Sequence, residues 1–282
     1  MGKETVEQHM KKLLFLDIDN TLYSGKSGVV PASALQAIRQ ARANGSMVFL
    51  CTGRSRAEAS RYLDYPVDGF IFGSGSRCEV AGKVIYDHPI DAGMVQMLAQ
   101  LIRSCGKGVL MGGNEGSYVD EKCWTDVVNY FSKPDADEAT KIKDMHENGM
   151  VPMKNRNLSD SIYKMGASKL HSDSFDELVK RLPKPFRLIQ TLSSPEGDFG
   201  DISDGTIMKK DGIRHVVEYL GREMEETVGI GDSGNDIDML ETCAIGIAMG
   251  NASEEVKKVA DWVTTDIDED GIYNAFAYLG VL

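Results

Sequence analysis

The sequence predicts an α/β fold in which a parallel sheet is interrupted by an inserted α+β segment. Short, continuous apolar runs alternate with helical stretches over residues 11–72, as in sheets whose parallel strands are buried on both faces. The same alternation returns over residues 211–279, after a stretch of mixed pattern. One sheet built from both ends of the chain explains why the alternation stops and later returns.

The first part of the chain is predicted as strand, helix, strand, helix, strand. The elements are a strand at Lys11–Asp19, a helix at 32–44 between Pro31 and Gly45, a strand at Met47–Cys51, a helix at Ser55–Leu63 and a strand at Phe70–Phe72. Next, Arg77–Val80 and Lys83–Asp87 flank Ala81-Gly82, which indicates a hairpin.

The inserted segment is expected to be a domain of its own. Its predicted elements are helices at Ala92–Ser104, Asp135–His146 and Ser172–Leu182, and strands at Ser161–Met165 and Phe186–Thr191. The later α/β elements are helices at Asp211–Leu220, Asp236–Thr242, Ser253–Val259 and Gly271–Leu279, with strands at Thr227–Ile230 and Ala244–Met249.

The composition is that of a folded protein with an acidic surface. The chain has 282 residues, and 31 Lys and Arg against 43 Asp and Glu give a formal net charge of −12. Such a surface repels polyanions, so neither nucleic acid nor an anionic membrane is expected as a partner. The five scattered cysteines favour free thiols and a cytoplasmic protein.

Two carboxylates follow the first predicted strand. Asp17 and Asp19 lie in the hexapeptide Asp-Ile-Asp-Asn-Thr-Leu at 17–22. Open α/β sheets bind ligands beyond the carboxyl ends of their strands. Side chains two residues apart on a strand share a face, so these carboxylates repel each other and a cation would relieve the repulsion. The alternative interpretation is a strand end with solvated acids.

Polar residues also follow two other predicted strands. Thr52 and Gly53 come after Met47–Cys51 and would suit an anion, although Thr-Gly is also a common turn. The run Gly-Asp-Ser-Gly-Asn-Asp at 231–236 follows another strand and supplies two more carboxylates. Lys209 precedes a helix and, taken alone, indicates no more than a solvated charge.

In this order the motifs resemble those of the haloacid dehalogenase (HAD) superfamily of phosphohydrolases, and most of all its Cof-type, sugar-phosphatase-like branch. The matching segments are DIDNTL at 17–22, TGR at 52–54, the lysine at 209 and GDSGNDIDML at 231–240. The resemblance implies a Rossmann-like parallel-sheet HAD core, residues 1–86 and 196–282, with an inserted α+β cap domain, residues 87–195. One departure is Ser-Gly-Ser at 74–76, where the branch usually has Asn-Gly-Ala, which concerns the cap hinge and the substrate entrance.

The resemblance also implies an activity, that of a Mg²⁺-dependent phosphoric monoester hydrolase working through an aspartyl-phosphate. Asp17 would be the nucleophile and Asp19 the general acid and base. The implied metal site comprises Asp17, Asp19 through its carbonyl, Asp232, Ser233 and Asp236. The implied phosphate-binding residues are Ile18, Thr52, Gly53, Lys209 and Asn235. In this family the lysine stands at a fixed spacing before the Leu-Gly that ends the next helix, which is Leu220-Gly221 here. That spacing selects Lys209 over Lys210.

The expected substrate is a small phosphorylated metabolite, with sugar phosphates as the first choice. A phosphomutase stays open as an alternative, as does a non-catalytic phospho-acceptor or regulatory binding protein. The second carboxylate, Asp19, favours turnover because it can activate water. Lys154, Asn155 and Arg156 are either substrate contacts of the cap or a solvated loop. The particular ester and the oligomeric state are left open.

Overall fold

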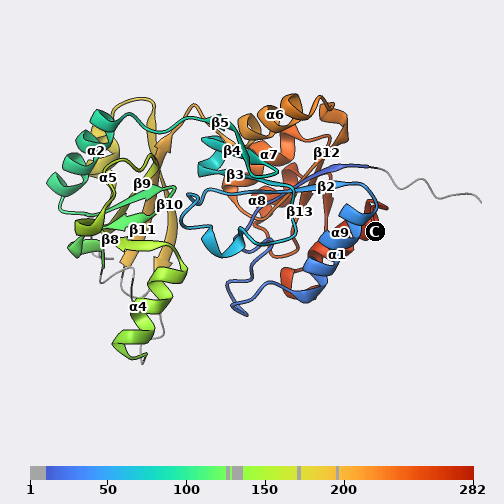
Figure 1. Ribbon diagram of the computed structural model, residues 1–282, viewed down its shortest axis with the longest axis horizontal. Helices are drawn as coiled ribbons and strands as arrows, with labels where there is room; N and C mark the ends of the chain where they lie inside the picture. The colour runs from blue at the N-terminus through green and yellow to red at the C-terminus, as the bar shows by residue number, and fades with distance from the viewer. Residues whose placement is uncertain (1–10, 125–127, 129–135, 170–172, 195–196) are drawn as a thin grey trace, which may run out of the picture. The chain divides into compact units, whose positions relative to one another are not determined.

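The computed structural model describes residues 11–124, 128, 136–169, 173–194 and 197–282. The chain divides into two compact units (Figure 1). The first unit comprises Met1–Gly53, Pro66–Tyr86 and Met208–Leu282, and the second comprises Arg54–Tyr65 and Asp87–Ile207. One unit has a largely parallel sheet and the other a mixed sheet, so the predicted α/β class is confirmed.

The sheet of the first unit has the strand order β14-β13-β12-β1-β2-β3-β4-β5. Its strands are β1 (Leu13–Leu16), β2 (Met47–Cys51), β3 (Gly69–Phe72), β4 (Arg77–Val80), β5 (Lys83–Asp87), β12 (Thr227–Gly231), β13 (Ile245–Ala248) and β14 (Trp262–Val263). The pairs from β14 to β3 are parallel, and β4 runs antiparallel to β3. The carboxyl ends of β2, β1 and β12 therefore lie next to one another at one edge.

Helices pack against this sheet. They are α1 (Ala32–Ala43), α6 (Lys209–Leu220), α7 (Ile237–Thr242), α8 (Glu254–Val259) and α9 (Gly271–Tyr278). Ile213 of α6, Met239 of α7 and Val256 of α8 join Phe15 and Phe49 in one apolar cluster, so these three helices cover the same face. Helices α1 and α9 lie side by side (Figure 1). The first turns of α6 and α7 are thereby brought to the edge where β2, β1 and β12 end.

The second unit has a mixed sheet in the order β10-β11-β9-β6-β7-β8. Its elements are α2 (Ala92–Ser104), β6 (Gly108–Gly113), β7 (Ser117–Val119), α4 (Glu138–Glu147), β8 (Met150–Pro152), β9 (Ile162–Lys169), α5 (Asp176–Arg181), β10 (Phe186–Ser194) and β11 (Gly197–Asp204). Leu98 of α2 and Leu178 of α5 pack with Met165 of β9. Met145 of α4 packs in another cluster, with Leu110 of β6. This unit therefore has an apolar core of its own.

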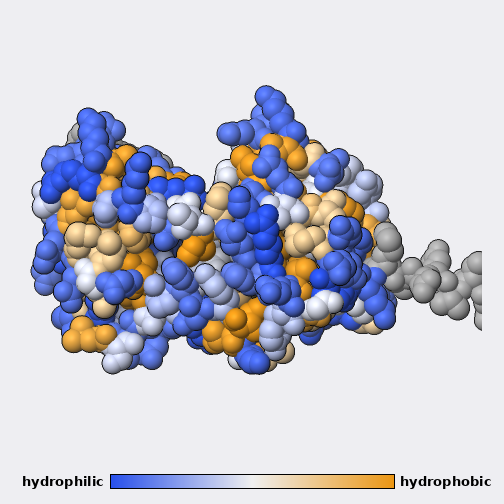
Figure 2. All heavy atoms as spheres, turned by 90° about the horizontal axis from the view of Figure 1, so that it is seen from above, coloured by the Kyte–Doolittle hydropathy of each residue, from blue (hydrophilic) through white to orange (hydrophobic). Residues whose placement is uncertain are grey.

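The surface is largely hydrophilic. Hydrophilic residues cover much of the face shown in Figure 2, with apolar groups between them. Within the part of the chain that the structure describes, every helix is too short or too polar to cross a membrane.

The predicted helix at Ser55–Leu63 is wrong over most of its length. The segment forms turns and a short 3-10 helix, η1, at Ser60–Tyr62. The carboxylate of Glu58 is buried, where Oε2 accepts the N–H of Ser55 at 2.8 Å and lies 3.2 Å from Nζ of Lys164 on β9. This tertiary ion pair outweighs the local preference for a helix, and it explains why the segment belongs to the second unit.

The sequence pattern did not indicate strands β6 and β11. Strand β6 reads Gly-Val-Leu-Met-Gly-Gly and β11 reads Gly-Asp-Phe-Gly-Asp-Ile-Ser-Asp. Glycine and aspartate are depleted in strands, so neither segment looks like one. Because β11 pairs with β9 and β10, residues 197–207 join the second unit, whereas the sequence-based division began the core again at residue 196.

Most other predicted elements are confirmed with shifted ends. Helix α6 begins at Lys209, two residues before its predicted start, and β9 extends to Lys169. The predicted starts of two helices, Asp135 and Ser172, lie outside the described residues, and so does the domain boundary predicted between 195 and 196.

Candidate active site

The site begins where β1 ends. Asp17 directly follows this strand and is buried, and its N–H donates to the carbonyl of Ile230 on β12 at 3.0 Å. The chain then turns, because the carbonyl of Ile18 accepts the N–H of Leu22 at 2.9 Å. Asp19 is half-buried in this turn. The two carboxylates predicted at this edge are therefore both present, and Asp17 is the deeper one.

Lys209, the first residue of α6, brings a buried cation to Asp17. Its side chain is fully buried, with Nζ 2.5 Å from Oδ1 of Asp17 and 2.6 Å from Oδ1 of Asp236. Burial lowers the pKa of Lys209, but the charges of Asp17 and Asp236 outweigh it and hold this pKa well above its ordinary value. Lys209 is therefore charged in the site. The structure brings Lys209, and not the ammonium of Lys210, to the carboxylates.

Close backbone packing allows α6 to begin at this point. A Cβ atom on Gly212 would lie 2.5 Å from Cγ2 of Ile71, and one on Gly75 would lie 2.4 Å from the carbonyl oxygen of Met208. Both glycines thus let the helix approach β3 and the turn after it. In that turn Ser74 adopts a left-handed conformation, with φ 55° and ψ 32°. This is the place where the chain departs from the Asn-Gly-Ala of the resembling branch.

The loop after β12 supplies two more buried carboxylates. Oδ2 of Asp236 accepts the N–H groups of Asp232 and Ser233 at 3.1 and 3.0 Å. A Cβ atom on Gly231 would lie 2.5 Å from the Asp236 side chain, so only glycine leaves room for it. The Thr21 hydroxyl donates to Oδ1 of Asp232 at 3.0 Å. This last contact was not assigned from the sequence, although Thr21 lies inside the first motif.

Asp17, Asp232 and Asp236 form a cluster that could hold a metal ion. One carboxylate oxygen from each lies within 4.8 Å of the others. Burial, and then the charge of Asp236, raises the pKa of Asp232 to about 7. Burial also raises the pKa of Asp17 well above its ordinary value; Lys209 opposes this shift, and the neighbouring carboxylates add to it. A divalent cation would relieve this repulsion. The cluster contains three of the five predicted metal ligands.

The other two predicted metal ligands are a backbone carbonyl, that of Asp19, and a hydroxyl, that of Ser233, so neither belongs to this group of carboxylates. The Ser233 hydroxyl donates to Oδ1 of Asn235 at 2.7 Å and to Oδ2 of Asp236 at 3.3 Å. Asp19 is close enough for its charge to raise the pKa of both Asp17 and Asp232. Both oxygens of Asp236 have partners, Lys209 on one side and backbone amides on the other. In this arrangement Asp236 orients the Lys209 ammonium and the loop after β12 relative to each other.

The predicted phosphate-binding residues come from neighbouring strand ends. Thr52 follows β2 and is buried, and its N–H donates to the carbonyl of Ile71 at 2.8 Å. A Cβ atom on Gly53 would lie 3.7 Å from Nδ2 of Asn235, so the ends of β2 and β12 face one space. Ile18 follows β1, and Lys209 starts α6.

The residues considered as cap contacts differ in their surroundings. Lys154 and Asn155 are exposed in a 3-10 turn, η3, at Met153–Asn155. The Arg156 guanidinium lies 5.9 Å from the centre of the Tyr118 ring. Lys154 and Asn155 are therefore open to solvent, whereas Arg156 packs against Tyr118 within the second unit.

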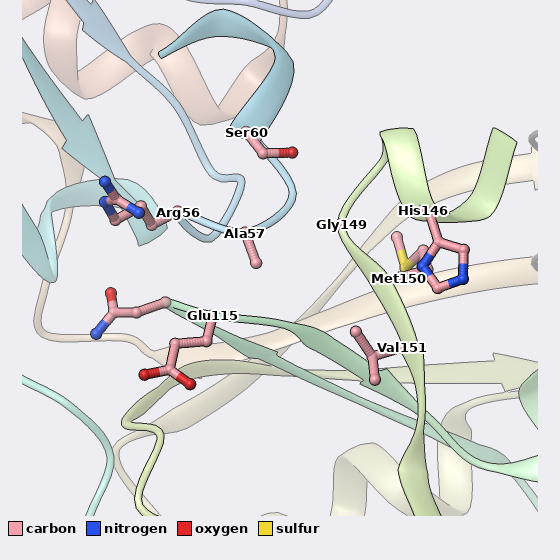
Figure 3. A pocket seen from close by; sticks show the side chains of 9 residues that line it. Arg56, Ala57, Ser60, Glu115, His146, Gly149, Met150 and Val151 are labelled. Carbon is pink, nitrogen blue, oxygen red and sulfur yellow. The ribbon is translucent and has the colours of Figure 1, made fainter. Parts of the chain in front are cut away.

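The second unit also has an open pocket of its own, with a volume of about 370 Å³ (Figure 3). The lining residues are Arg56, Ala57, Ser60, Asn114, Glu115, His146, Gly149, Met150 and Val151. In Figure 3 the Glu115 carboxylate and the His146 ring lie on opposite sides of the view. No residue assigned to catalysis, phosphate binding or metal binding from the sequence is among the lining residues.

Buried carboxylates and a buried lysine beyond the strand ends of an open parallel sheet are typical of α/β proteins that bind and transfer phosphoryl groups. The sequence model of the haloacid dehalogenase-like hydrolases matches residues 14–276, and the chain belongs to this family. It is a HAD-type phosphatase, a phosphoric monoester hydrolase of the Cof-type subclass.

Individual relatives agree with this assignment. The sugar phosphatase BT4131 of HAD subclass IIB is 29% identical, with a TM-score of 0.74 over 96% of this chain and 100% of its own. The phosphatase BT1666 from Bacteroides thetaiotaomicron is 27% identical, with a TM-score of 0.75 over 100% and 98% of the two chains. The 5-amino-6-(5-phospho-D-ribitylamino)uracil phosphatase YwtE of Bacillus subtilis is 25% identical over 93% of this chain and 95% of its own.

Proposed function

We propose that this phosphatase hydrolyses small phosphorylated metabolites, sugar phosphates first among them, through an aspartyl-phosphate on Asp17. The observation that carries the proposal is the buried Asp17 carboxylate at the end of β1, paired with Lys209 and clustered with two further carboxylates. The likeness to a sugar phosphatase over nearly the whole chain supports the substrate class.

In the first half-reaction, a carboxylate oxygen of Asp17 attacks phosphorus. A bond forms between this oxygen and phosphorus, and the bond from phosphorus to the leaving alcohol oxygen breaks. Asp19, two residues further along, gives its proton to that oxygen. The reaction is thereby divided into two displacements, each easier than a direct attack by water.

In the second half-reaction, water cleaves the aspartyl-phosphate. Asp19 is now ionised and takes a proton from the water as its oxygen bonds to phosphorus. The bond between phosphorus and the Asp17 oxygen breaks, which releases inorganic phosphate and restores both carboxyl groups. The half-buried position of Asp19 suits this exchange, because the group must meet both the leaving alcohol and the incoming water.

The phosphoryl oxygens would lie among groups from three strand ends. The amides of Ile18 and Gly53, the Thr52 hydroxyl and the Asn235 amide supply donors, and Lys209 supplies a positive charge. Donors that are held in place before the reaction stabilise the charge of the transition state without reorganisation. The pairing of Lys209 with both Asp17 and Asp236 supplies this rigidity.

The acidic cluster fits Mg²⁺. Its ligand atoms are carboxylate oxygens, which this ion prefers. Asp17 and Asp232 would hold it, with the Asp19 carbonyl as a further ligand, while Asp236 and Ser233 would orient them. When bound, the ion would neutralise the repulsion between the substrate dianion and Asp17. The Thr21 hydroxyl keeps Asp232 in place for this role.

We infer that the second unit acts as the substrate-selecting cap. It comprises residues 54–65 and 87–207, a wider span than the predicted 87–195. We also place the enzyme in the cytoplasm, because all five cysteines are free thiols.

A screen of phosphorylated metabolites with Mg²⁺, read as phosphate release, tests the proposal. Sugar monophosphates are expected among the best substrates, with phosphate and alcohol formed in equal amounts. An absence of release from every ester would contradict hydrolysis. Release confined to another class of ester would contradict the substrate assignment alone.

A further inference from the structure

The first turn of α7 carries a buried carboxylate with no role in the chemistry described above. Asp238 is buried, with 8% of its surface exposed. Its Oδ2 accepts the N–H of Lys210 at 2.9 Å. The contact joins two helices, since Asp238 lies in α7 and Lys210 in the first turn of α6.

The amide that Asp238 accepts is one that helix α6 cannot satisfy by itself. The first N–H groups of an α-helix have no partner inside it, and they are usually capped by a polar side chain. The residue before α6 is Met208, whose side chain has no oxygen. Asp211 turns its Oδ2 to the N–H of Met208, at 2.9 Å. Asp238 therefore supplies a carboxylate to the start of α6 from the neighbouring helix.

This contact lies one residue from Lys209. The ammonium of Lys209 is fixed by Asp17 and Asp236, and the backbone that follows it is fixed by Asp238. Asp236 and Asp238 are two residues apart, so one short segment contacts both the ammonium of Lys209 and the backbone at the start of α6. Without the Asp238 contact, the start of α6 could shift, and the Lys209 ammonium would shift with it relative to Asp17.

We propose that Asp238 is a positioning residue that sets the place of the Lys209 ammonium against the phosphoryl group. The inference rests on the proposed role of Lys209 in phosphate binding. Asp238 acts through the Lys210 amide and touches neither the substrate nor the metal ligands' oxygens. Its effect should appear in the chemical step, because a displacement of about 1 Å in a catalytic group can cost roughly 100-fold in rate.

The direct test is Asp238→Ala, with kcat and KM measured on the best sugar phosphate. We expect kcat to fall by about 10- to 100-fold while KM changes by less than about 3-fold. Asp238→Asn keeps an oxygen that can accept the Lys210 N–H, so it should recover most of the lost kcat. Asp238→Leu keeps the branched shape without an acceptor and should behave like Asp238→Ala. The leucine variant takes the place of the alanine variant if the latter does not fold.

A double-mutant cycle separates positioning from general destabilisation. If Asp238 acts through Lys209, Asp238→Ala should change kcat by less than about 2-fold when Lys209→Ala is already present. A matched control is Asp91→Ala, which removes a carboxylate that accepts two amides at the start of α2. This control should leave kcat unchanged. Urea unfolding of each variant gives the folded fraction for which the rates are corrected.

Two results would overturn the inference. One is an equal effect of Asp238→Ala in the presence and absence of Lys209, and the other is a kcat as low for Asp238→Asn as for Asp238→Ala. Full activity of Lys209→Ala itself would instead contradict the proposed function. The failure of one claim is therefore distinguishable from the failure of the other.

Discussion

Lys209 and Asp236 form a fully buried ion pair, with Nζ of the lysine 2.6 Å from Oδ1 of the aspartate. The second oxygen of Asp236 accepts the amides of Asp232 and Ser233. One carboxylate thus joins the start of α6 to the loop after β12. Removing one partner of such a pair leaves an uncompensated buried charge, so the cluster should respond strongly to single substitutions.

The first prediction distinguishes two adjacent lysines. Lys209→Ala should lower kcat/KM by about 100- to 1,000-fold, because a preorganised cation beside the phosphoryl group is lost. Lys210→Ala should cost under about 1 kcal/mol in transition-state stabilisation, since its ammonium is not at the carboxylates. Steady-state kinetics on one sugar phosphate measure both effects. The reverse order of the two variants would show that the wrong lysine has been assigned to the site.

The second prediction concerns proton transfer by Asp19. Asp19→Asn should nearly abolish hydrolysis of sugar phosphates, whose alkoxide leaving group needs a proton. The loss should be smaller for p-nitrophenyl phosphate, whose leaving group needs little protonation. The measurement is the ratio of kcat/KM for the two substrates in each protein. An unchanged ratio would contradict a role for Asp19 in protonating the leaving group.

The third prediction concerns the metal ion. EDTA should stop phosphate release and added Mg²⁺ should restore it, because the oxygen ligands of Asp17 and Asp232 suit this ion. Thr21→Val removes the hydrogen bond that holds Asp232 and should raise the Mg²⁺ concentration for half-maximal rate by about 10- to 100-fold. Full activity after thorough removal of metal would contradict the assignment.

The fourth prediction uses the buried ion pair of the second unit. Burial alone would raise the pKa of Glu58, but Lys164, the Ser55 amide and other partners outweigh it and lower the pKa from its ordinary 4.5. A carboxyl group with a lowered folded-state pKa contributes stability above its unfolded pKa and loses it as pH falls through the folded value. The free energy that Glu58→Gln costs should therefore be about 1–3 kcal/mol at pH 7 and should shrink below pH 4.5.

Urea unfolding at several pH values measures this effect. Glu147→Gln is a matched control, because Glu147 is exposed and its pair with Lys143 is long, at 3.6 Å. It should change the free energy of unfolding by less than about 0.5 kcal/mol at every pH. A free-energy cost of Glu58→Gln that grows as pH falls would contradict a lowered pKa for Glu58 in the folded protein.

The sequence predicted that the candidate site residues would gather at one edge of the sheet, because strand ends are local features. Asp17, Thr52 and Asp232 each follow an apolar run, and parallel pairing brings the ends of such runs to one edge. The double contact of Asp236 was not predictable in this way. It depends on the approach of α6, which packing at Gly212 permits.

The inserted segment was less predictable because its elements depend on tertiary partners. The glycine-rich run at Gly108–Gly113 becomes a strand only through pairing with β7 and β9. The segment at Ser55–Leu63 loses its expected helix to the ion pair between Glu58 and Lys164. Neither partner is visible from local periodicity, so the pattern gave the wrong result there.

The nucleophile is the centre of the account, and Asp17→Asn with a sugar phosphate and Mg²⁺ tests it most directly. The asparagine keeps the shape of the side chain but has no nucleophilic carboxylate. We expect a folded protein with no phosphate release above background and no phosphorylated intermediate trapped by acid quench, whereas the wild-type protein yields a trapped aspartyl-phosphate. Turnover comparable to the wild type in this folded variant would contradict the account.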